Sequence, residues 1–599
     1  MPQPPDDLAL AALFEPAVAG QWPQLVASAL VKARRLDPDD DPARALELLS
    51  STTYDGITVR PLYTADDATT DASVGIPGVS PFVRGTSRRT PSGWDVRQQH
   101  PHHPDPAVTH EAVMADLENG VTSLWLSDPA PGSLARVLDG VLFDVAPVAL
   151  DAGRHTEALA DELLTVLGDA PDARGNLGAD PIGLRARLGA PADLGVLGRL
   201  ARRSPLRAVT VDATGYHDAG GSDAQELGAS IATGLAYLRA LTDAGLDIGA
   251  AFGQLEFRYA ANADQFLVIA KLRAARRLWA RVAEVCGVSG AEGGQRQHVV
   301  TSSAMMTRRD PWVNLLRTTL AVFGAGAGGA DSITVQPFDA AIGRPDAFSR
   351  RIARNTSSLL VMESHLARVT DPAGGSWYVE RLTDDLANAA WDQFTAIEGQ
   401  GGMLATLESG RFAAEIDEVW QQRARNLATR HDPLTGVSEF PLLDEISVVR
   451  EPWPERPPRA EGALPVHRYA EEYEALRDAA DACPERPRVF LATIGPVAVH
   501  TARASFAAGL FQAGGLATPS AADGVSFEDS GATVACLASS DKVYAEQAEA
   551  VARELKEAGA RHVLLAGRPG DYAGVDGYVF TGVDALAVLR DLHRRIGVV

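Results

Sequence analysis

A repeated alternation of short apolar strands and amphipathic helices is the feature that most constrains the fold of this chain. From about residue 54 to residue 400, each β-rich run is followed by a stretch whose apolar residues recur at helical spacing. The strands named by this pattern are Val121–Leu126, Val145–Leu150, Ala208–Thr214, Gln297–Ser303 and Ser332–Phe338. Strands and helices that alternate at this spacing favour parallel βα units. So many units predict a (β/α)8 barrel, which we place at residues 51–402.

The alternation restarts on a smaller scale after a change in composition. Residues 403–487 contain charged helical stretches and the run VREPWPERPPRAEGALP, whose prolines are typical of an extended linker. Beyond it, short apolar strands alternate with helices again. These strands are Val489–Thr493, Val534–Leu537, His562–Ala566 and Tyr578–Thr581. We expect a flavodoxin-like, doubly wound domain at residues 488–599.

Composition excludes several classes of function. The formal net charge of −23 disfavours binding to nucleic acid or to an anionic membrane, because both need basic patches. The three cysteines form no CxxC pattern, so we expect neither disulfides nor a thiolate zinc site, which fits a cytoplasmic protein. No signal peptide or membrane-spanning run is visible. Residues 1–50 are predicted to be an amphipathic arm, with Phe14, Trp22 and Leu25 as anchors for a subunit contact.

Four sequence stretches resemble the methylmalonyl-CoA mutase family, and the resemblance covers most of the chain. They are Thr214–Gly220 (TGYHDAG), Lys271–Ala280 (KLRAARRLWA), Phe348–Thr356 (FSRRIARNT) and Val369–Thr383 (VTDPAGGSWYVERLT). Within that family, the chain is most similar to the non-catalytic small subunits. The resemblance implies a barrel that converts methylmalonyl-CoA and succinyl-CoA, with adenosylcobalamin held between the barrel and the tail domain.

In the family, the cobalt ligand is the histidine of an Asp-x-His-x-x-Gly motif in the tail, where the aspartate fixes the tautomer of the imidazole. Alignment of the tail on Gly495 and Gly514 needs no gap, and it places other residues at the cofactor positions. These positions are Val497, Val499 and Ala502 in the first motif, Ala538 and Ser540 in the second, and Arg568 in the third. His500 is one residue out of register, and we expect a solvated or capping histidine there. The tail is therefore expected to bind neither cobalamin nor a metal.

The barrel has lost most of the residues that the family uses for substrate. No tyrosine lies between Arg84 and Trp94, and the family's substrate arginine would fall near Ala192 or Asp193. The family's glutamine is Val300, although the neighbours His298, Thr301 and Ser302 remain. The active-site histidine is present as His217. We expect His217 to be a vestigial, structural residue that is hydrogen-bonded at the barrel mouth, because no catalysis is expected without the cofactor.

Two further motifs are predicted to have no function. Gly324–Gly329 (GAGAGG) resembles a dinucleotide-binding loop but follows a predicted helix instead of a strand, so we expect a flexible loop. His100, His102 and His103 alternate with prolines, and we expect a solvated loop instead of a metal site.

The leading hypothesis is an interaction subunit, which forms a heterodimer with a catalytic large subunit that holds the adenosylcobalamin. The family resemblance implies this arrangement, and the isolated chain is then expected to be inactive. Two alternatives stay open. The chain could be an active acyl-CoA mutase with unusual cofactor determinants, or a repurposed protein that binds CoA esters.

Overall fold

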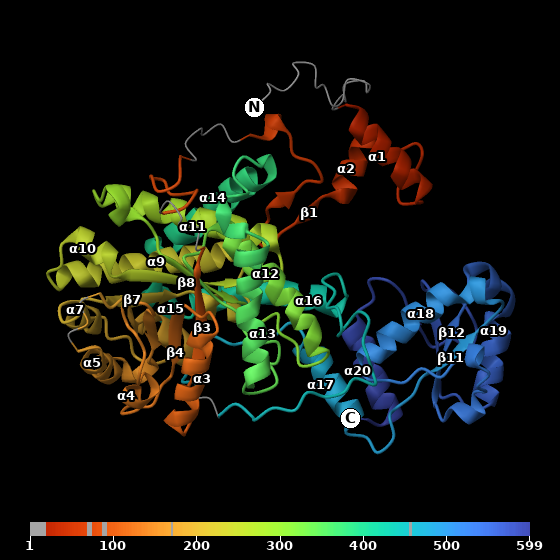
Figure 1. Cartoon of the computed structure of the whole chain (residues 1–599). Coiled ribbons are helices and arrows are strands. Elements are labelled where there is room, and N and C mark those ends of the chain that lie inside the picture. Colours follow the sequence, from red (N-terminus) through yellow and green to blue (C-terminus); the bar gives the residue numbers. More distant parts are fainter. Residues whose placement is uncertain are drawn as a thin grey trace, which may run out of the picture.

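The computed structural model describes residues 20–68, 75–86, 93–168, 170, 172–454 and 458–598. Within these ranges, eight parallel strands close into a barrel in the order β10-β3-β4-β5-β6-β7-β8-β9. They are β3 (Asp95–Pro101), β4 (Ser123–Ser127), β5 (Val148–Asp151), β6 (Gly175–Ala179), β7 (Arg207–Asp212), β8 (Leu255–Ala261), β9 (Gln297–Thr301) and β10 (Ser332–Thr334). The barrel architecture predicted from the sequence is confirmed (Figure 1).

Helices cover the outside of the barrel and begin at capping residues that the sequence supplies. The Asp105 side chain accepts a hydrogen bond from Ala107 N–H at the start of α3. Ser222 and Gln225 form a reciprocal capping box at the start of α9. The barrel helices are α3 (Pro106–Glu118), α4 (Leu134–Val137), α5 (Thr156–Leu167), α6 (Pro181–Leu188), α7 (Gly195–Ala201), α8 (Thr214–Asp218), α9 (Asp223–Asp243), α10 (Ile248–Gly253), α11 (Gln265–Val285), α12 (Asn314–Gly328), α13 (Ala347–Ser358) and α14 (Trp377–Gly399). None of the helices in the described ranges is long and apolar enough to cross a membrane.

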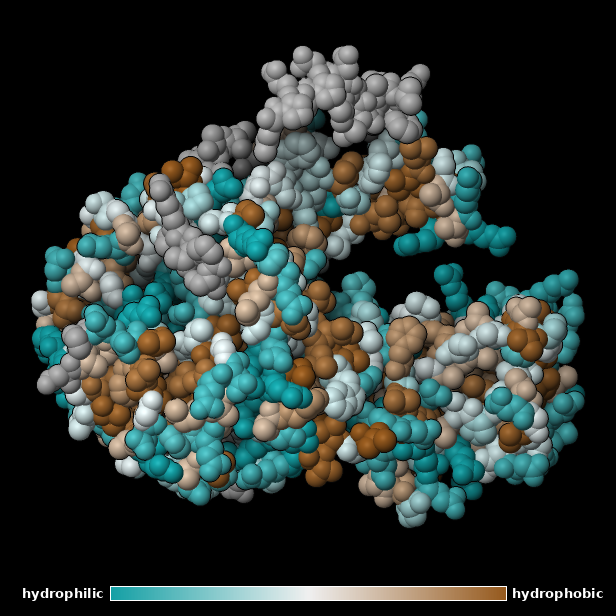
Figure 2. Space-filling view, viewed as in Figure 1, coloured by the Kyte–Doolittle hydropathy of each residue, from teal (hydrophilic) through white to brown (hydrophobic). Residues whose placement is uncertain are grey.

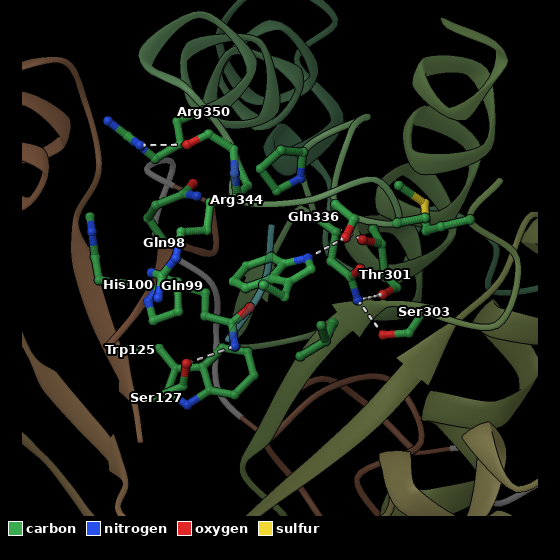
Figure 3. A pocket seen from close by; sticks show the side chains of 18 of the residues that line it. Gln98, Gln99, His100, Trp125, Ser127, Thr301, Ser303, Gln336, Arg344 and Arg350 are labelled. Atoms are coloured by element: carbon green, nitrogen blue, oxygen red, sulfur yellow. Dashed lines mark hydrogen bonds between the residues drawn. The ribbon is translucent and has the colours of Figure 1, made fainter. Parts of the chain in front are cut away.

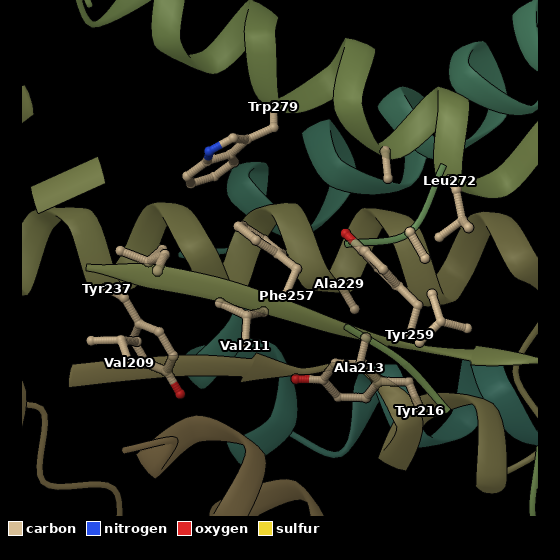
Figure 4. Packing of buried hydrophobic residues seen from close by; sticks show 14 of the residues in the cluster. Val209, Val211, Ala213, Tyr216, Ala229, Tyr237, Phe257, Tyr259, Leu272 and Trp279 are labelled. Atoms are coloured by element: carbon tan, nitrogen blue, oxygen red, sulfur yellow. The ribbon is translucent and has the colours of Figure 1, made fainter. Parts of the chain in front are cut away.

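Alternate residues of a barrel strand face opposite sides, and the two sides differ in polarity. On the outer side of β8, Phe257 and Tyr259 pack beneath α9 and α11, and the ring centroid of Phe257 lies 4.7 Å from that of Trp279 (Figure 4). On the inner side of the same strand, Glu256 and Arg258 bond to side chains of other strands. The hydrophobic core therefore lies between the barrel and its helices, whereas the barrel interior is polar.

The glycine-rich run Gly324–Gly329 forms the end of α12, so the prediction of a flexible loop is wrong. A Cβ atom at Gly326 would lie 2.6 Å from the ring of Trp94, and one at Gly324 would lie 3.0 Å from the backbone of Gln265. Gly329 ends the helix in the left-handed conformation that glycine adopts readily. The glycines are needed because α12 packs very closely against α11 and Trp94.

Helices between the barrel and the tail extend the cores of both. The side chains of α15 (Met403–Glu408) and α16 (Arg411–Ala428) pack into the core of the barrel. Those of α17 (Glu471–Asp481) pack into the core of the tail.

The tail contains a four-stranded parallel sheet with the order β11-β12-β13-β14, which is consistent with the predicted flavodoxin-like fold. Its elements are β11 (Phe490–Thr493), α18 (Val497–Ala513), β12 (Val534–Ala538), α19 (Asp541–Glu557), β13 (His562–Ala566), β14 (Gly577–Val579) and α20 (Ala585–Ile596). Isolated parallel bridges pair Ala517 with Arg488 and Ser520 with Leu491. The segment 517–520 thus lies on the free edge of β11, where the second strand of a flavodoxin-like sheet belongs.

The N-terminal residues form a helical hairpin that projects from the body (Figure 1). It consists of α1 (Gln21–Lys32) and α2 (Pro42–Leu49), and the small strands β1 (Ser51–Thr52) and β2 (Thr58–Val59) follow it. The two helices pack on each other through Leu30, Leu36 and two alanines, a cluster separate from the barrel core. Phe14 of the predicted arm lies outside the described residues.

Candidate functional site

Charged side chains fill the lower part of the barrel interior. Arg97 of β3 donates hydrogen bonds to Ser123 Oγ at 3.0 Å and to Glu256, and both ends of the Arg97–Glu256 ion pair are buried. Although burial alone would raise it, the charges of Arg97 and Arg296 lower the pKa of Glu256 to about 2. The Glu256 carboxylate is therefore ionised, and Arg97 of another barrel strand pairs with it.

A second layer fills the axis nearer the carboxyl ends of the strands, which form the barrel mouth. The guanidinium carbon of Arg258 lies 4.1 Å from the ring centroid of Trp125. Arg258 also donates to Asp212 at 2.9 Å and to Nδ1 of His298 at 3.1 Å. Because Nδ1 accepts this hydrogen bond, Nε2 of His298 carries the ring proton and donates to Thr334 Oγ1 at 2.8 Å. Each of these side chains is at least nine-tenths buried, so bulky groups occupy the path along the axis.

His217 lies on α8, which follows β7 at the barrel mouth. Its Nε2 atom is 2.7 Å from Ser302 Oγ, and its Nδ1 atom is 3.7 Å from a carboxylate oxygen of Glu226. Burial lowers the pKa of His217 to about 3, and the charge of Lys271 adds to this effect. The structure thus places a neutral, hydrogen-bonded imidazole at the mouth.

Glu226 belongs to a buried ionic cluster beneath that histidine. Lys271 lies 2.8 Å from both Glu226 and Asp223, and the Lys271 and Glu226 side chains are fully buried. Burial raises the pKa of Glu226 to about 7 against the opposing charge of Lys271. The cluster joins α9 to α11 and holds the helix that faces His217.

A cavity of about 480 Å³ lies at the barrel mouth, between the ends of β3, β4, β9 and β10 (Figure 3). The side chain of Gln336 forms part of the cavity wall. Its Nε2 atom donates to the Thr301 carbonyl and to Ser303 Oγ, each at 2.8 Å. Trp453 of the proline-rich segment reaches into the cavity, and its indole N–H donates to the Ala340 carbonyl at 2.8 Å. The segment is fixed there by a backbone hydrogen bond of 2.7 Å from Arg344 to Glu451.

The described positions of the family's substrate residues hold an apolar side chain and an ion-paired side chain. Val300 packs with Trp125 and Ala149 inside the barrel. Asp193 is exposed at the rim and pairs with Arg199 at 2.7 Å. The region between Arg84 and Trp94 includes residues 87–92, which lie outside the described residues.

The histidine-proline segment differs from its prediction at one residue. His100 is 3% exposed and lies within β3, where its Nε2 atom is 3.6 Å from Asp116. The prediction of a solvated loop is therefore wrong for His100, because the strand continues through the segment and turns this side chain toward α3. No group of three potential metal-binding side chains occurs in the described part of the chain.

In the tail, the positions of the cobalt-binding motif lie in a helix. Pro496 precedes α18, Val497 is its first residue, and Val499 follows within the first turn. His500 is buried, with Nδ1 3.1 Å from the Gly495 carbonyl oxygen, so the prediction of a solvated histidine is wrong. The imidazole thus turns back toward the loop before α18.

Tyr544 occupies the space between the second and third cofactor signatures. Its hydroxyl accepts a hydrogen bond of 2.7 Å from Ser539 N–H, after β12, and lies 2.9 Å from the Ala566 carbonyl, at the end of β13. A Cβ atom at Gly567 would already lie 3.2 Å from Arg503 and 3.5 Å from Tyr544. The carboxyl ends of these strands, where flavodoxin-like domains bind ligands, are therefore filled by protein. These residues do not fit a cobalamin.

The sequence did not identify several residues of this region. Trp125, Tyr544 and Trp453 lie in or next to stretches predicted only as strand, helix or linker, and Arg258 lies in a stretch for which no element is predicted. The one available signal was the pair of charges at Glu256 and Arg258 inside an otherwise apolar run, LEFRYAA, which indicates a polar inner face.

Comparison with known proteins agrees with this geometry. A family model described as methylmalonyl-CoA mutase matches residues 201–457. The chain is 58% identical to the methylmalonyl-CoA mutase small subunit of Streptomyces virginiae, over 99% of each chain. It is 42% identical to the small subunit of Propionibacterium freudenreichii subsp. shermanii, over 99% of this chain and 97% of that one. A methylmalonyl-CoA mutase of Cereibacter sphaeroides is 30% identical over 69% of this chain and 64% of its own length.

Proposed function

The chain belongs to the methylmalonyl-CoA mutase family, among its small subunits, and we propose that it is the non-catalytic member of a heterodimer. The partner is a catalytic large subunit, which holds adenosylcobalamin and interconverts methylmalonyl-CoA and succinyl-CoA. The chain acts as a subunit of an isomerase and is inactive alone. We propose a cytoplasmic location for the complex, consistent with the reduced cysteines that the sequence predicts.

One observation carries the proposal: the cobalt-binding position of the tail holds a valine, and a buried tyrosine lies between the ends of β12 and β13. Val499 stands at the position of the ligand, inside the first turn of α18. Tyr544 and Arg503 close the region between β12 and β13. A corrin ring would have to unwind the helix and displace a buried tyrosine, and it would gain no metal ligand in exchange.

The barrel supports the same proposal independently. In the family, the CoA chain runs along the barrel axis, but here Arg258, Trp125 and His298 occupy that axis. These side chains are mutually bonded, so a ligand could enter only by breaking a buried ionic network. His217 is neutral and hydrogen-bonded to Ser302.

The helical hairpin supports the proposal of a protein partner. Leu25 of α1 is 69% exposed, and Leu48 and Leu49 at the end of α2 are also exposed. The two helices pack mainly on each other, so their free sides remain available to another chain. We therefore propose that this hairpin contacts the large subunit.

Reconstitution tests the proposal directly. The chain, a large subunit with an intact Asp-x-His-x-x-Gly motif, and an equimolar mixture are each assayed for mutase turnover with adenosylcobalamin. We expect no turnover by this chain and a one-to-one complex in the active mixture. Full turnover by the chain alone would refute the proposal and favour the active mutase with unusual cofactor determinants.

The mouth cavity favours a second candidate, a protein that binds CoA esters without converting them. The cavity measures about 480 Å³ and is lined by Gln98, Gln99 and Gln336, whose amides could bind an acyl group. The filled axis argues against passage of the CoA chain. A thermal shift of the isolated chain with methylmalonyl-CoA, but not with free CoA, would support this candidate.

A further inference from the structure

Helix α12 carries apolar residues on two opposite faces, one buried and one exposed among the described residues. Its inner face packs through Val322, Gly324 and Gly326 against α11 and Trp94. Its outer face presents Leu316, which is 65% exposed, followed by Leu320 and Phe323. The outer face of α12 is thus an exposed apolar stripe, and such a stripe marks a candidate interaction surface.

Neighbouring segments extend this surface across the barrel mouth. Trp312, just before α12, is 50% exposed and stacks on Phe338 with ring centroids 4.6 Å apart. Phe338 in turn contacts the exposed Phe348 at the start of α13. On the linker, Ile446 is 91% exposed, and its neighbour Glu445 receives a hydrogen bond of 2.6 Å from Asp310 N–H.

We call this surface the α12 face and define it by six apolar residues. They are Trp312, Leu316, Leu320, Phe323, Phe348 and Ile446. Figure 2 shows hydrophobic side chains gathered over the front of the molecule, around α12 and toward the tail. The six residues lie on three segments that hydrogen bonds and ring contacts join into one surface.

The size of the α12 face suits a subunit interface. Aromatic side chains bury roughly 150–250 Å² each, so the three aromatic residues of the α12 face, which are about half exposed, offer on the order of 300 Å², to which the three aliphatic residues add. A stable interface buries about 800 Å² on each partner, with an apolar centre and a polar rim. An apolar patch of this size on a monomer typically marks an interaction site.

We propose that the α12 face is the surface on which the large mutase subunit docks. This inference rests on the proposed function, and the names of the relatives, which are small subunits, point to a larger partner. A second copy of this chain is disfavoured, because pairing would bring together two molecules that each carry a net charge of −23.

The test replaces exposed leucines by glutamate and measures binding to the purified large subunit by analytical ultracentrifugation. Leu316→Glu with Leu320→Glu is expected to weaken binding at least about 100-fold, because two buried charges would face an apolar centre. Leu142→Glu is the matched control, since Leu142 is 67% exposed and lies before β5. It is expected to bind within about threefold of the unmodified chain.

The possible results distinguish a failure of the proposed docking surface from a failure of the proposed function. If the unmodified chain binds and the double variant binds equally well, the α12 face is refuted and the proposed function stands. If the unmodified chain binds no large subunit, both are refuted. A homodimer of the isolated chain that the double variant disrupts would assign the face to a second copy and overturn the proposal. Unchanged thermal unfolding of both variants confirms that only binding is affected.

Discussion

Trp125 is the residue whose replacement tests whether the barrel axis is filled as described. Its side chain is 6% exposed, Arg258 stacks on its ring, and the centroid of His298 lies 5.4 Å from its own, edge to face. Loss of a buried tryptophan to alanine costs about 3–5 kcal/mol. Loss of the desolvated cation–π contact adds about 1 kcal/mol.

One contribution reduces the loss in free energy of unfolding that Trp125→Ala causes. The indole N–H of Trp125 is buried without a hydrogen-bond partner among the described residues. Its removal recovers a penalty of about 1 kcal/mol. We therefore expect Trp125→Ala to lower the free energy of unfolding of the barrel by about 4 kcal/mol. Trp125→Phe keeps an aromatic ring beneath Arg258 and removes the unpaired donor, so we expect a cost below about 1.5 kcal/mol.

Differential scanning calorimetry of the isolated chain measures both variants on the barrel transition. A loss of about 4 kcal/mol corresponds to a decrease of roughly 5 °C in the Tm of a barrel of about 350 residues, whose unfolding entropy is about 0.7 kcal/mol per kelvin. A loss below about 1 kcal/mol in Trp125→Ala would refute the account, because the axis would then be loosely packed. An equal loss in both variants would also refute it, since the N–H would then have a partner.

Three further predictions concern other parts of the chain. Lys271→Met leaves Glu226 buried without its cation and is expected to cost about 3–5 kcal/mol in urea unfolding at pH 8. The loss should be smaller at pH 5.5, because Glu226 takes up a proton there in the folded state. Gly326→Ala places a methyl group 2.6 Å from an aromatic ring and should cost about 1–2 kcal/mol, whereas Gly509→Ala, with open space, should stabilise α18 by about 0.5–1 kcal/mol. Deletion of residues 20–49 should leave the Tm of the barrel unchanged and weaken binding of the large subunit at least about tenfold.

The pH dependence of the unmodified chain follows from the same carboxylate. The pKa of Glu226 is about 7 in the folded protein, against an ordinary value of 4.5. Between these values the folded state binds more protons than the unfolded state, so stability falls as the pH rises through this window. Constant stability from pH 5 to pH 8 would contradict the assignment. Lys542→Met, an exposed lysine on α19, is the matched control for Lys271→Met.

The sequence predicted the barrel because apolar strands and amphipathic helices alternate, but it did not name β3, β6 and β8. In β8, Glu256 and Arg258 interrupt the apolar pattern, because they face a polar axis instead of a core. In β6, Gly175 and Gly178 adopt positive φ angles and leave few side chains to indicate a strand. A strand pattern that assumes an apolar barrel interior therefore misses a strand such as β8, whose charged residues face the axis.

The same reasoning explains which site features were predictable. Hydrogen bonding of His217 at the barrel mouth was predicted, because a polar residue after a barrel strand needs a partner there. The position of Trp125 in the barrel axis was not predicted. An apolar run does not reveal which side chains point into the barrel, and a shift of one residue in the register reverses the direction of every side chain. The helical conformation of the glycines in α12 was likewise not predictable. Their close packing depends on Trp94, which lies more than two hundred residues away in the sequence.

The most direct test of the central proposal is a titration of the purified chain with adenosylcobalamin, followed by visible absorbance and by equilibrium dialysis. We expect no spectral change and no bound corrin at micromolar concentrations, both for this chain and for a variant with Val497→Asp, Val499→His and Ala502→Gly. The triple variant restores the ligand but leaves Tyr544 in place. Stoichiometric binding of cobalamin by the unmodified chain would contradict the account.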